Sequence, residues 1–334
     1  MTDIIQLINK APKAELHLHI EGCLEPELMF DLAKRNNVKI AFKNINEVKL
    51  AYNFQDLQSF LNIYYQSAKV LVEERDFFDL TWSYILKCKD NNIVHTEIFF
   101  DPQTHTNRNI KFEVVINGIY KALKKAKKEF NLSSKIIMCF LRHLNENSAF
   151  KTLDQALDHK NKIDGVGLDS AETGNPPSKF KNVFKKAIEK NFMTVAHAGE
   201  EGPNDYIWQA LNILKVKRID HGVQCLGDPK LVEKLKKEQI PLTVCPLSNI
   251  KLCVFKKLED HNLKKLLDKG LMVMVNSDDP AYFGGYLNSN LIECQKALNL
   301  SKEDIKKLII NSFKSSFLEE NEKKKWIKQI NNLM

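Results

Sequence analysis

Short apolar segments alternate with longer amphipathic segments along most of this chain. Eight segments of five to seven residues are dominated by apolar side chains, and seven of them precede a stretch with apolar residues at helical spacing. Such segments are typical of buried β-strands, and the stretches between them of helices that cover a sheet. The predicted strands are Glu15–Ile20, Val94–Phe100, Lys135–Leu141, Gly165–Asp169, Phe192–His197, Arg218–Val223, Leu242–Pro246 and Leu271–Ser277.

The alternation of strand and helix predicts a parallel sheet that is buried on both faces. Eight such units match a TIM (β/α)8 barrel, and we expect residues 1–334 to form one barrel domain. The chain is longer than a typical barrel, and the surplus predicts extra helices over 56–72 and 75–91, after the first strand, and over 301–315 and 319–332, at the C-terminus. An open doubly wound sheet is the alternative, but GVGLDS at Gly165–Ser170 matches only half of a dinucleotide-binding fingerprint.

Composition excludes several classes of protein. Hydrophobic residues make up 43% of the 334 residues and charged residues 28%, which is typical of a globular protein. No run of 18 apolar residues predicts a membrane span, and the first residues, MTDIIQLINK, predict no secretory signal. The seven cysteines include no CxxC pair, so we expect reduced thiols and a cytoplasmic protein.

The net charge of +8 raises the question of a nucleic-acid partner. Almost all of the positive charge is lysine, and it gathers in amphipathic stretches such as Lys121–Lys128 and Lys234–Lys237. Proteins that hold phosphates usually use arginine forks as well, and arginine is scarce here. We therefore interpret these runs as solvated helix faces and expect no nucleic-acid partner.

Polar residues at the ends of the predicted strands carry the candidate chemistry. Barrel enzymes place their active sites at the C-terminal ends of the strands. His17 and His19 end the first strand, and because they are two residues apart their side chains point to one face. His197 ends the fifth strand and Asp278 follows the eighth. Together these four residues would supply three imidazoles and one carboxylate, a set that suits one zinc ion.

Three further residues lie beside these candidate ligands. Glu200 follows His197 after a small Ala-Gly step, and a carboxylate there suits proton transfer or, as the alternative, the start of a helix. His221 ends the sixth strand and could be a fifth ligand, a base or a buried structural residue. Asp279 adjoins Asp278, and two neighbouring carboxylates repel unless one binds a cation, although Asp279 could also cap a helix.

One absence favours a single metal ion. Two-metal barrel hydrolases commonly hold both ions with a modified lysine at the end of the fourth strand. That strand ends in Leu168-Asp169-Ser170, without a lysine. We therefore expect one zinc ion in each subunit.

Five motifs resemble those of the adenosine/adenine deaminase family and occur in the family's order. They are ELHLHIEG at Glu15–Gly22, AHAGE at Ala196–Glu200, RIDHG at Arg218–Gly222, CPLSN at Cys245–Asn249 and NSDDP at Asn276–Pro280. The resemblance implies a TIM barrel with one zinc ion and the hydrolytic loss of ammonia from a 6-aminopurine. A purine-binding barrel without activity is the alternative class, but inactive members of an enzyme family usually lose a metal ligand or the catalytic acid.

The resemblance also implies a role for each matching residue. His17, His19, His197 and Asp278 would bind zinc. Glu200 would donate a proton to the purine N1, and His221 would orient and help deprotonate the attacking water. The remaining residue, Asp279, would form a hydrogen bond with N7.

Several segments resemble the adenine-specific branch of the family more than adenosine deaminases. The first motif ends in Glu21-Gly22, where adenosine deaminases usually carry Asp-Gly near the ribose. A site for free adenine needs an acceptor for its N9–H and little empty volume beyond it, and the sequence does not indicate which group accepts that N–H. Glu21 could fill the space of the ribose, and Glu172 could also reach inward. We therefore expect adenine to be converted to hypoxanthine and ammonia in purine salvage. Adenosine or an N6-modified 6-aminopurine remains the alternative substrate, and the sequence does not indicate an oligomeric state.

Overall fold

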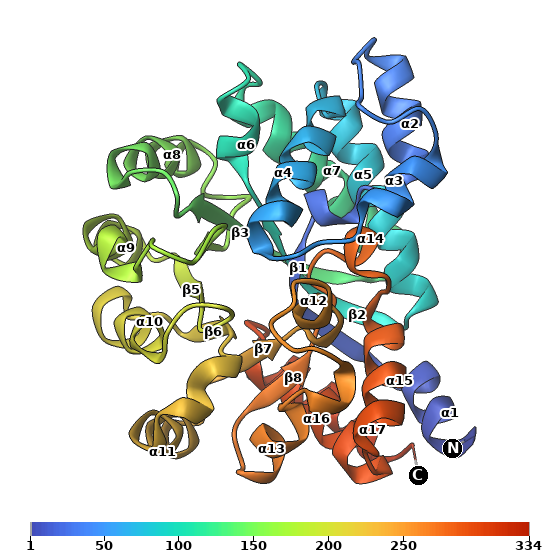
Figure 1. Cartoon of the computed structure of the whole chain (residues 1–334), viewed down its shortest axis with the longest axis vertical. Coiled ribbons are helices and arrows are strands. Elements are labelled where there is room, and N and C mark those ends of the chain that lie inside the picture. The colour runs from blue at the N-terminus through green and yellow to red at the C-terminus, as the bar shows by residue number, and fades with distance from the viewer. Residues whose placement is uncertain (1, 334) are drawn as a thin grey trace.

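Eight parallel strands follow one another in chain order around a barrel, and helices surround it (Figure 1). The computed structural model describes residues 2–333. The TIM-barrel prediction is confirmed, with every predicted strand present. The strands are β1 (Lys13–His19), β2 (Ile93–Phe100), β3 (Ser133–Leu141), β4 (Gly165–Asp169), β5 (Met193–Ala198), β6 (Arg218–His221), β7 (Leu242–Val244) and β8 (Val273–Val275).

The ring closes where the end of β1 meets the segment after β8. Leu18 and Asp278 form an isolated parallel bridge there. The His19 N–H donates to the Asp278 carbonyl over 3.0 Å, and the Asp278 N–H donates to the His17 carbonyl over 3.2 Å. This junction brings two histidines of β1 and the aspartate after β8 to one place.

β7 and β8 are shorter than the sequence predicts, because side chains and turns replace the ladder near their ends. Cys245 caps a short helix directly after β7. After β8, the Asn276 side chain accepts the Leu16 N–H over 2.8 Å, and the Asn276 N–H donates to the Val244 carbonyl over 2.9 Å. A side-chain amide thus takes the place of a strand carbonyl at the closing seam.

The predicted extra helices are present. Those after the first strand are α4 and α5, and those at the C-terminus are α16 and α17. α4 begins where the Asp56 side chain accepts the Ser59 N–H over 2.8 Å, a capping arrangement that satisfies a free helix donor. The helices are α1 (Thr2–Lys10), α2 (Pro26–Arg35), α3 (Ile45–Ala51), α4 (Leu57–Ser67), α5 (Glu74–Asp90), α6 (Pro102–Thr106), α7 (Phe112–Phe130), α8 (Glu146–Asp158), α9 (Lys181–Glu189), α10 (Asn204–Gln209), α11 (Pro229–Glu238), α12 (Pro246–Lys251), α13 (Leu263–Asp268), α14 (Pro280–Phe283), α15 (Leu287–Leu298), α16 (Lys302–Ser315) and α17 (Glu320–Asn331).

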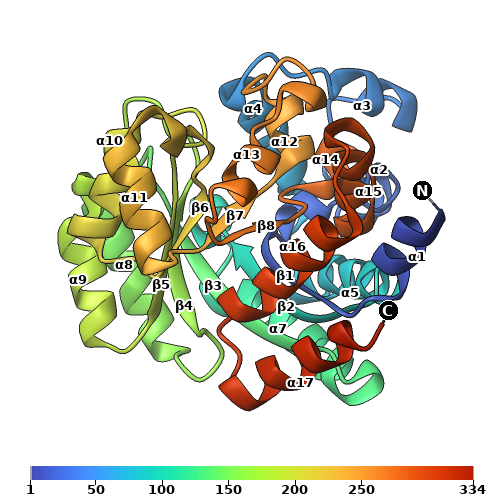
Figure 2. The same ribbon diagram turned by 90° about the horizontal axis from the view of Figure 1, so that it is seen from below.

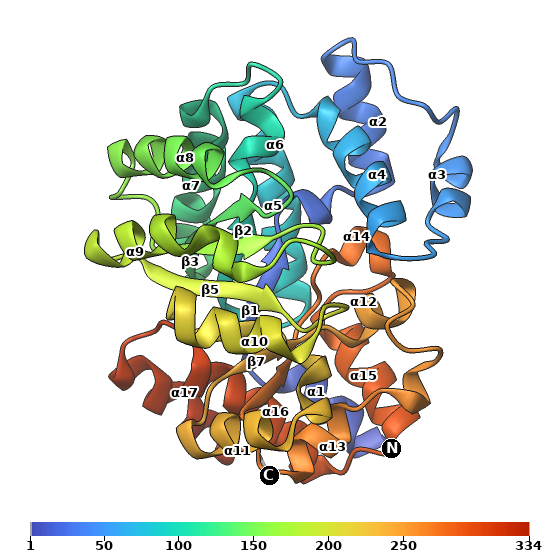
Figure 3. The ribbon, with the colours of Figure 1, turned by 60° about the vertical axis from the view of Figure 1, so that its left-hand side comes forward.

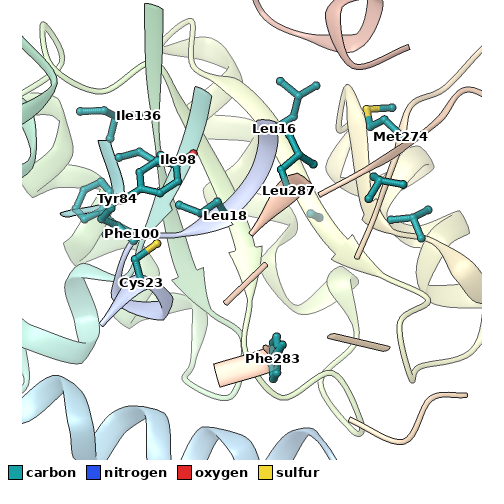
Figure 4. Packing of buried hydrophobic residues seen from close by; sticks show 14 of the residues in the cluster. Leu16, Leu18, Cys23, Tyr84, Ile98, Phe100, Ile136, Met274, Phe283 and Leu287 are labelled. Atoms are coloured by element: carbon teal, nitrogen blue, oxygen red, sulfur yellow. The ribbon is translucent and has the colours of Figure 1, made fainter. Parts of the chain in front are cut away.

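Successive side chains of β1 point to opposite faces of the barrel wall, so its leucines and its histidines lie on different sides. Leu16 and Leu18 point to the helix-covered side, where Leu18 pairs with Ile98 of β2 and Ile98 with Ile136 of β3 (Figure 4). All of these side chains are buried. The two histidines of β1 therefore face the inside of the barrel, as the two-residue period of a strand requires.

A charged network fills the middle of the barrel below the histidines. Arg218 of β6 forms an ion pair with Glu97 of β2, and both side chains are fully buried. Burial opposes the charge on Glu97, but Arg218 and His95 outweigh it and lower the Glu97 pKa. The same guanidinium donates to the Leu16 carbonyl over 2.8 Å, so the network holds β1, β2 and β6 together.

Helices α4, α12 and α14 gather at one end of the barrel (Figures 2 and 3). Residues of α4 and α14 line the same pocket as the strand-end histidines, so this is the C-terminal end of the strands. In the described range, no helix has the length and apolar character needed to cross a membrane. The seven cysteines are free, and all but Cys253 are buried.

Candidate active site

The four predicted ligands lie together inside the C-terminal end of the barrel. His17 and His19 come from β1, His197 from β5, and Asp278 directly follows β8. All four side chains are buried. The strand-end pattern in the sequence therefore located one cluster in space.

The spacing between these donor atoms fits a metal ion. The His17 Nε2 lies 3.3 Å from the Asp278 Oδ1, and the His19 Nε2 lies 3.5 Å from the same oxygen. The Nε2 atoms of His19 and His197 are 3.1 Å apart. Ligand atoms about 2.0–2.2 Å from one tetrahedral zinc ion stand roughly 3.3–3.5 Å from each other. The buried His17 Nε2 also has no hydrogen-bond partner among the described residues, so the donor set fits a cation.

His221 belongs to the same cluster. The potential donor atoms of His17, His197, His221 and Asp278 all lie within 4.8 Å of one another. His19 groups instead with Asp278 and Asp279, or with Asp101 and Asp169. His221 thus stands among the candidate ligands, where either a further ligand or a base would stand.

The other ring nitrogen of each β1 and β5 histidine faces a supporting group. The His17 Nδ1 lies 2.9 Å from the Thr243 Oγ1, whose hydroxyl donates to Asp220 over 2.9 Å. The His197 Nδ1 lies 3.1 Å from the Leu168 carbonyl oxygen. Such contacts fix the ring orientation of metal-binding histidines. Asp220 therefore supports His17 and also pairs with Arg218 at 3.4 Å.

Glu200 lies beside His221 at the edge of the cluster. The His221 Nε2 is 3.5 Å from the Glu200 Oε2 and 3.7 Å from the Asp278 Oδ2. Burial, with a smaller contribution from Asp278, raises the pKa of Glu200 well above its usual value. Burial and the nearby His17 lower the pKa of His221 to about 3. The Glu200 carboxyl and the His221 imidazole thus stand side by side at the edge of the cluster.

The two adjacent aspartates differ in environment. Burial opposes the charge on Asp278, but His17 and the other imidazoles lower its pKa well below the usual value. Burial and the neighbouring Asp278 raise the pKa of Asp279. The Asp279 Oδ1 is buried without a partner among the described residues. One carboxylate therefore faces the cation site, and the other belongs to a pocket-lining residue with one oxygen that has no partner among the described residues.

Three residues at this end of the barrel adopt a left-handed backbone. Ser170, His221 and Asp278 have φ values of +74°, +65° and +65°. Non-glycine residues rarely adopt this conformation, and such strain concentrates at functional sites. At each of these three positions the backbone turns sharply at a strand end, and the side chain points into the mouth of the barrel.

A pocket opens directly above the cluster. His19, His197, Glu200, His221, Asp278 and Asp279 form its polar floor, and apolar side chains from α4, α14 and the segment after α12 form much of its wall. Concave sites with a few convergent polar groups are typical of small-molecule binding. The wall residues are Leu57, Phe60, Leu61, Tyr64, Tyr65, Asp101, Asp169, Ser170, Leu252 and Phe283.

Glu21 does not line this pocket, contrary to the expectation that it fills ribose space. Its Oε1 accepts the Asp101 N–H over 3.2 Å and lies 2.9 Å from the His105 Nε2. The side chain is buried, and burial raises its pKa to about 7. Glu21 therefore fixes the turn after β2, where Asp101 reaches the pocket.

Glu172 also lies away from the pocket lining, contrary to the expectation that it reaches the substrate. Its carboxylate accepts the backbone N–H groups of four consecutive residues, Gly199–Gly202. The sequence predicted that Glu172 could reach inward, and nothing in the residue pattern indicates that the next loop binds its carboxylate.

Sequence reasoning missed the pocket wall. Asp101 directly follows β2 and Asp169 ends β4, so the rule that found the histidines could have found these carboxylates too. The apolar wall from α4 carried no such signal, because Leu57, Phe60 and Leu61 read as an ordinary helix face.

Comparison with known proteins gives the same family over the whole chain. The adenosine deaminase family model matches residues 12–333. The adenine deaminase of Crocosphaera subtropica is 63% identical over 317 residues, covering 95% of this chain and 97% of that protein. The adenine deaminase of Acinetobacter baylyi is 58% identical, covering 98% of this chain and 99% of that protein.

A solved structure agrees with the fold. The crystal structure of adenine deaminase from Arthrobacter aurescens superposes with a TM-score of 0.95 at 47% identity. The match covers 96% of this chain and 98% of that one. The barrel and its added helices are therefore shared along nearly the full length.

Proposed function

The chain belongs to the adenosine deaminase family, and we propose that it catalyses the hydrolytic deamination of adenine to hypoxanthine and ammonia. The observation that carries this proposal is the pairing of Glu200 and His221 beside the cation cluster, at 3.5 Å from each other. Relatives named adenine deaminase, matched over nearly their whole length, favour adenine as the 6-aminopurine. We treat residues 1–334 as one deaminase domain in the cytoplasm.

The metal site of this proposal consists of His17, His19, His197 and Asp278. Imidazole nitrogens and one carboxylate oxygen suit zinc, and we propose one zinc ion in each chain. When bound, the ion acts as a Lewis acid and lets water react near neutral pH. His221 stays free in this assignment, because its Nε2 faces both Glu200 and Asp278.

The protein side chains move the protons of the reaction. His221 accepts a proton from the water that attacks C6, and Glu200 donates its proton to N1, which drains electron density from the ring. The exocyclic amine then takes the proton held by His221 and leaves C6 as ammonia. The hydroxyl proton at C6 returns to the Glu200 carboxylate as the carbonyl forms, so water and adenine become hypoxanthine and ammonia. Each such positioned proton transfer contributes about 10²–10⁴-fold to the rate.

Asp279 orients the purine in this scheme. Asp279 lines the pocket, and its Oδ1 has no partner among the described residues. A protonated carboxyl there donates to N7, which accepts a hydrogen bond in the N9–H form of adenine. With N1 at Glu200 and N7 at Asp279, C6 faces the cluster.

The pocket favours the free base over the nucleoside. Adenine carries an N9–H donor, and Asp101 and Asp169 offer carboxyl oxygens that have no partner among the described residues. Leu57, Phe60 and Phe283 close the wall with apolar atoms. With adenosine, a buried acceptor of N9–H loses its donor, at a cost of about 1–3 kcal/mol. Adenosine is therefore the weaker substrate.

The test is ammonia release from zinc-loaded protein, with adenine and adenosine in parallel. We expect kcat/KM for adenine to exceed that for adenosine by about 10–100-fold, which corresponds to that cost. Preferred turnover of adenosine would refute the role of the N9–H acceptor. Turnover of N6-methyladenine alone would identify a modified base as the substrate.

A further inference from the structure

We infer that Glu172 is a positioning residue, whose carboxylate holds the loop Gly199–Gly202 and thereby fixes Glu200 at N1 of the substrate. The inference rests on the proposed function, because it assigns Glu172 a task in the deamination itself. It replaces the expected contact between Glu172 and the purine with a contact to the backbone that carries the acid.

Four consecutive backbone N–H groups converge on this one carboxylate. The Glu172 Oε1 accepts from Gly199 over 2.7 Å. The Oε2 accepts from Glu200 over 3.0 Å, from Glu201 over 3.1 Å and from Gly202 over 2.8 Å. A turn that points successive N–H groups to one place is a general anion-binding arrangement, and here the anion belongs to the chain itself.

The backbone engages both oxygens of this carboxylate. The Oε2 accepts three of the four N–H groups and the Oε1 accepts the fourth. The side chain is also almost completely buried and lies outside the pocket lining. Glu172 therefore binds the loop and does not face the space of the substrate.

Arg142 binds backbone carbonyl groups beside the N–H groups that Glu172 binds. Its guanidinium donates to the His197 carbonyl over 2.8 Å and to the Asn175 carbonyl over 2.9 Å. The Arg142 Nη1 lies 4.0 Å from the Glu172 Oε1, and both side chains are buried. The arginine thus fixes the carbonyl at the end of β5 and also the loop that carries Glu172, which makes the two loops one unit.

Two glycines of the loop permit this approach. Gly199 has a φ of +69°, a conformation that favours glycine. A Cβ on Gly202 would stand 2.5 Å from the Glu172 Cδ, so only glycine lets the carboxylate reach the loop. Gly199 and Gly202 of AHAGEEGP thus stand where the loop folds around the Glu172 carboxylate.

Glu200 depends on its backbone for its position. Its Oε1 is buried without a partner among the described residues, and its Oε2 faces His221 at 3.5 Å. Its main chain is held by Glu172 at the N–H and by Gln224, whose Nε2 donates to the Glu200 carbonyl over 3.1 Å. Removing the carboxylate of Glu172 therefore releases the acid while every candidate metal ligand keeps its side chain.

The first test is Glu172→Gln, which preserves size but turns an N–H₂ group toward backbone donors. We expect kcat for adenine to fall about 10²-fold, the effect of a misplacement of about 1 Å, with KM within about threefold of the original value. Zinc content should stay unchanged, and hydrogen exchange of the amides of 199–202 should accelerate. Glu201→Gln is the matched control, because Glu201 lies on the same loop and, among the described residues, its side chain forms a hydrogen bond with Thr173 alone. It should change none of these values.

A double-mutant cycle with Glu200→Gln separates positioning from general loosening. If Glu172 acts through Glu200, Glu172→Gln should cost less than about threefold in kcat once Glu200 is already Gln. An equal loss in both backgrounds would overturn the inference, and so would a rise in KM of tenfold or more with kcat unchanged. If the unaltered protein does not deaminate adenine at all, the proposed function fails, whereas unchanged amide exchange in Glu172→Gln would remove the positioning role itself.

Discussion

Glu200→Gln is expected to lower kcat for adenine by about 10²–10⁴-fold, the range that a positioned proton donor contributes. The amide has nearly the same shape as the carboxyl but cannot donate the acidic proton that N1 requires. Glu200 is buried at the pocket floor and 3.5 Å from His221, so neither water nor another carboxyl replaces it easily.

The variant should still bind metal and purine. Glu200 is outside the set of four ligands proposed here, so zinc content should match that of the unaltered protein, and KM should change only a few-fold. Steady-state kinetics with adenine, together with metal analysis of the same samples, provide the measurement. A kcat within threefold of the original value would contradict the assignment of Glu200 as the acid.

His17→Asn is expected to remove both the metal and at least about 10³-fold of the activity, because a bound metal ion supplies several kcal/mol of transition-state stabilisation. His17 supplies a fully buried Nε2 without a hydrogen-bond partner among the described residues, 3.3 Å from the Asp278 Oδ1. Asparagine is too short to bring a donor atom to the same point, and Thr243 then loses its imidazole partner.

Elemental analysis after dialysis against excess zinc measures this loss directly. The matched control is His159→Asn, because His159 caps the end of α8 and stacks on Phe112 away from the pocket. It should retain both zinc and activity. Full zinc content in His17→Asn would show that the ion binds elsewhere.

The barrel could be predicted because its strands are short, apolar and regularly spaced. Every predicted strand forms. β6, β7 and β8 each end two residues before the predicted end, and at β7 and β8 a turn and the Asn276 side chain replace ladder bonds. A side-chain amide that substitutes for a strand carbonyl has no periodic signature in a sequence, so the strand ends could not be read from it.

The residues of the polar pocket floor could be predicted because barrel enzymes place their active sites at the C-terminal ends of the strands. The roles of Glu21 and Glu172 could not be predicted in this way. The parallel barrel brings all strand ends together, which is why His17, His197 and Asp278 could be grouped from their positions alone. Both glutamates also lie near strand ends, but their carboxylates bond to neighbouring loops. The donor that a buried carboxylate binds depends on the conformation of the neighbouring loop, such as the φ of +69° at Gly199.

The central claim is that one zinc ion at the histidine cluster supports deamination of adenine, and a zinc titration of the metal-free protein tests it most directly. Formation of hypoxanthine from adenine is followed while zinc is added in fractions of an equivalent. We predict no turnover without metal, a linear rise and a plateau at one zinc ion per chain. Full turnover by metal-free protein, or a plateau at two ions per chain, would contradict the account.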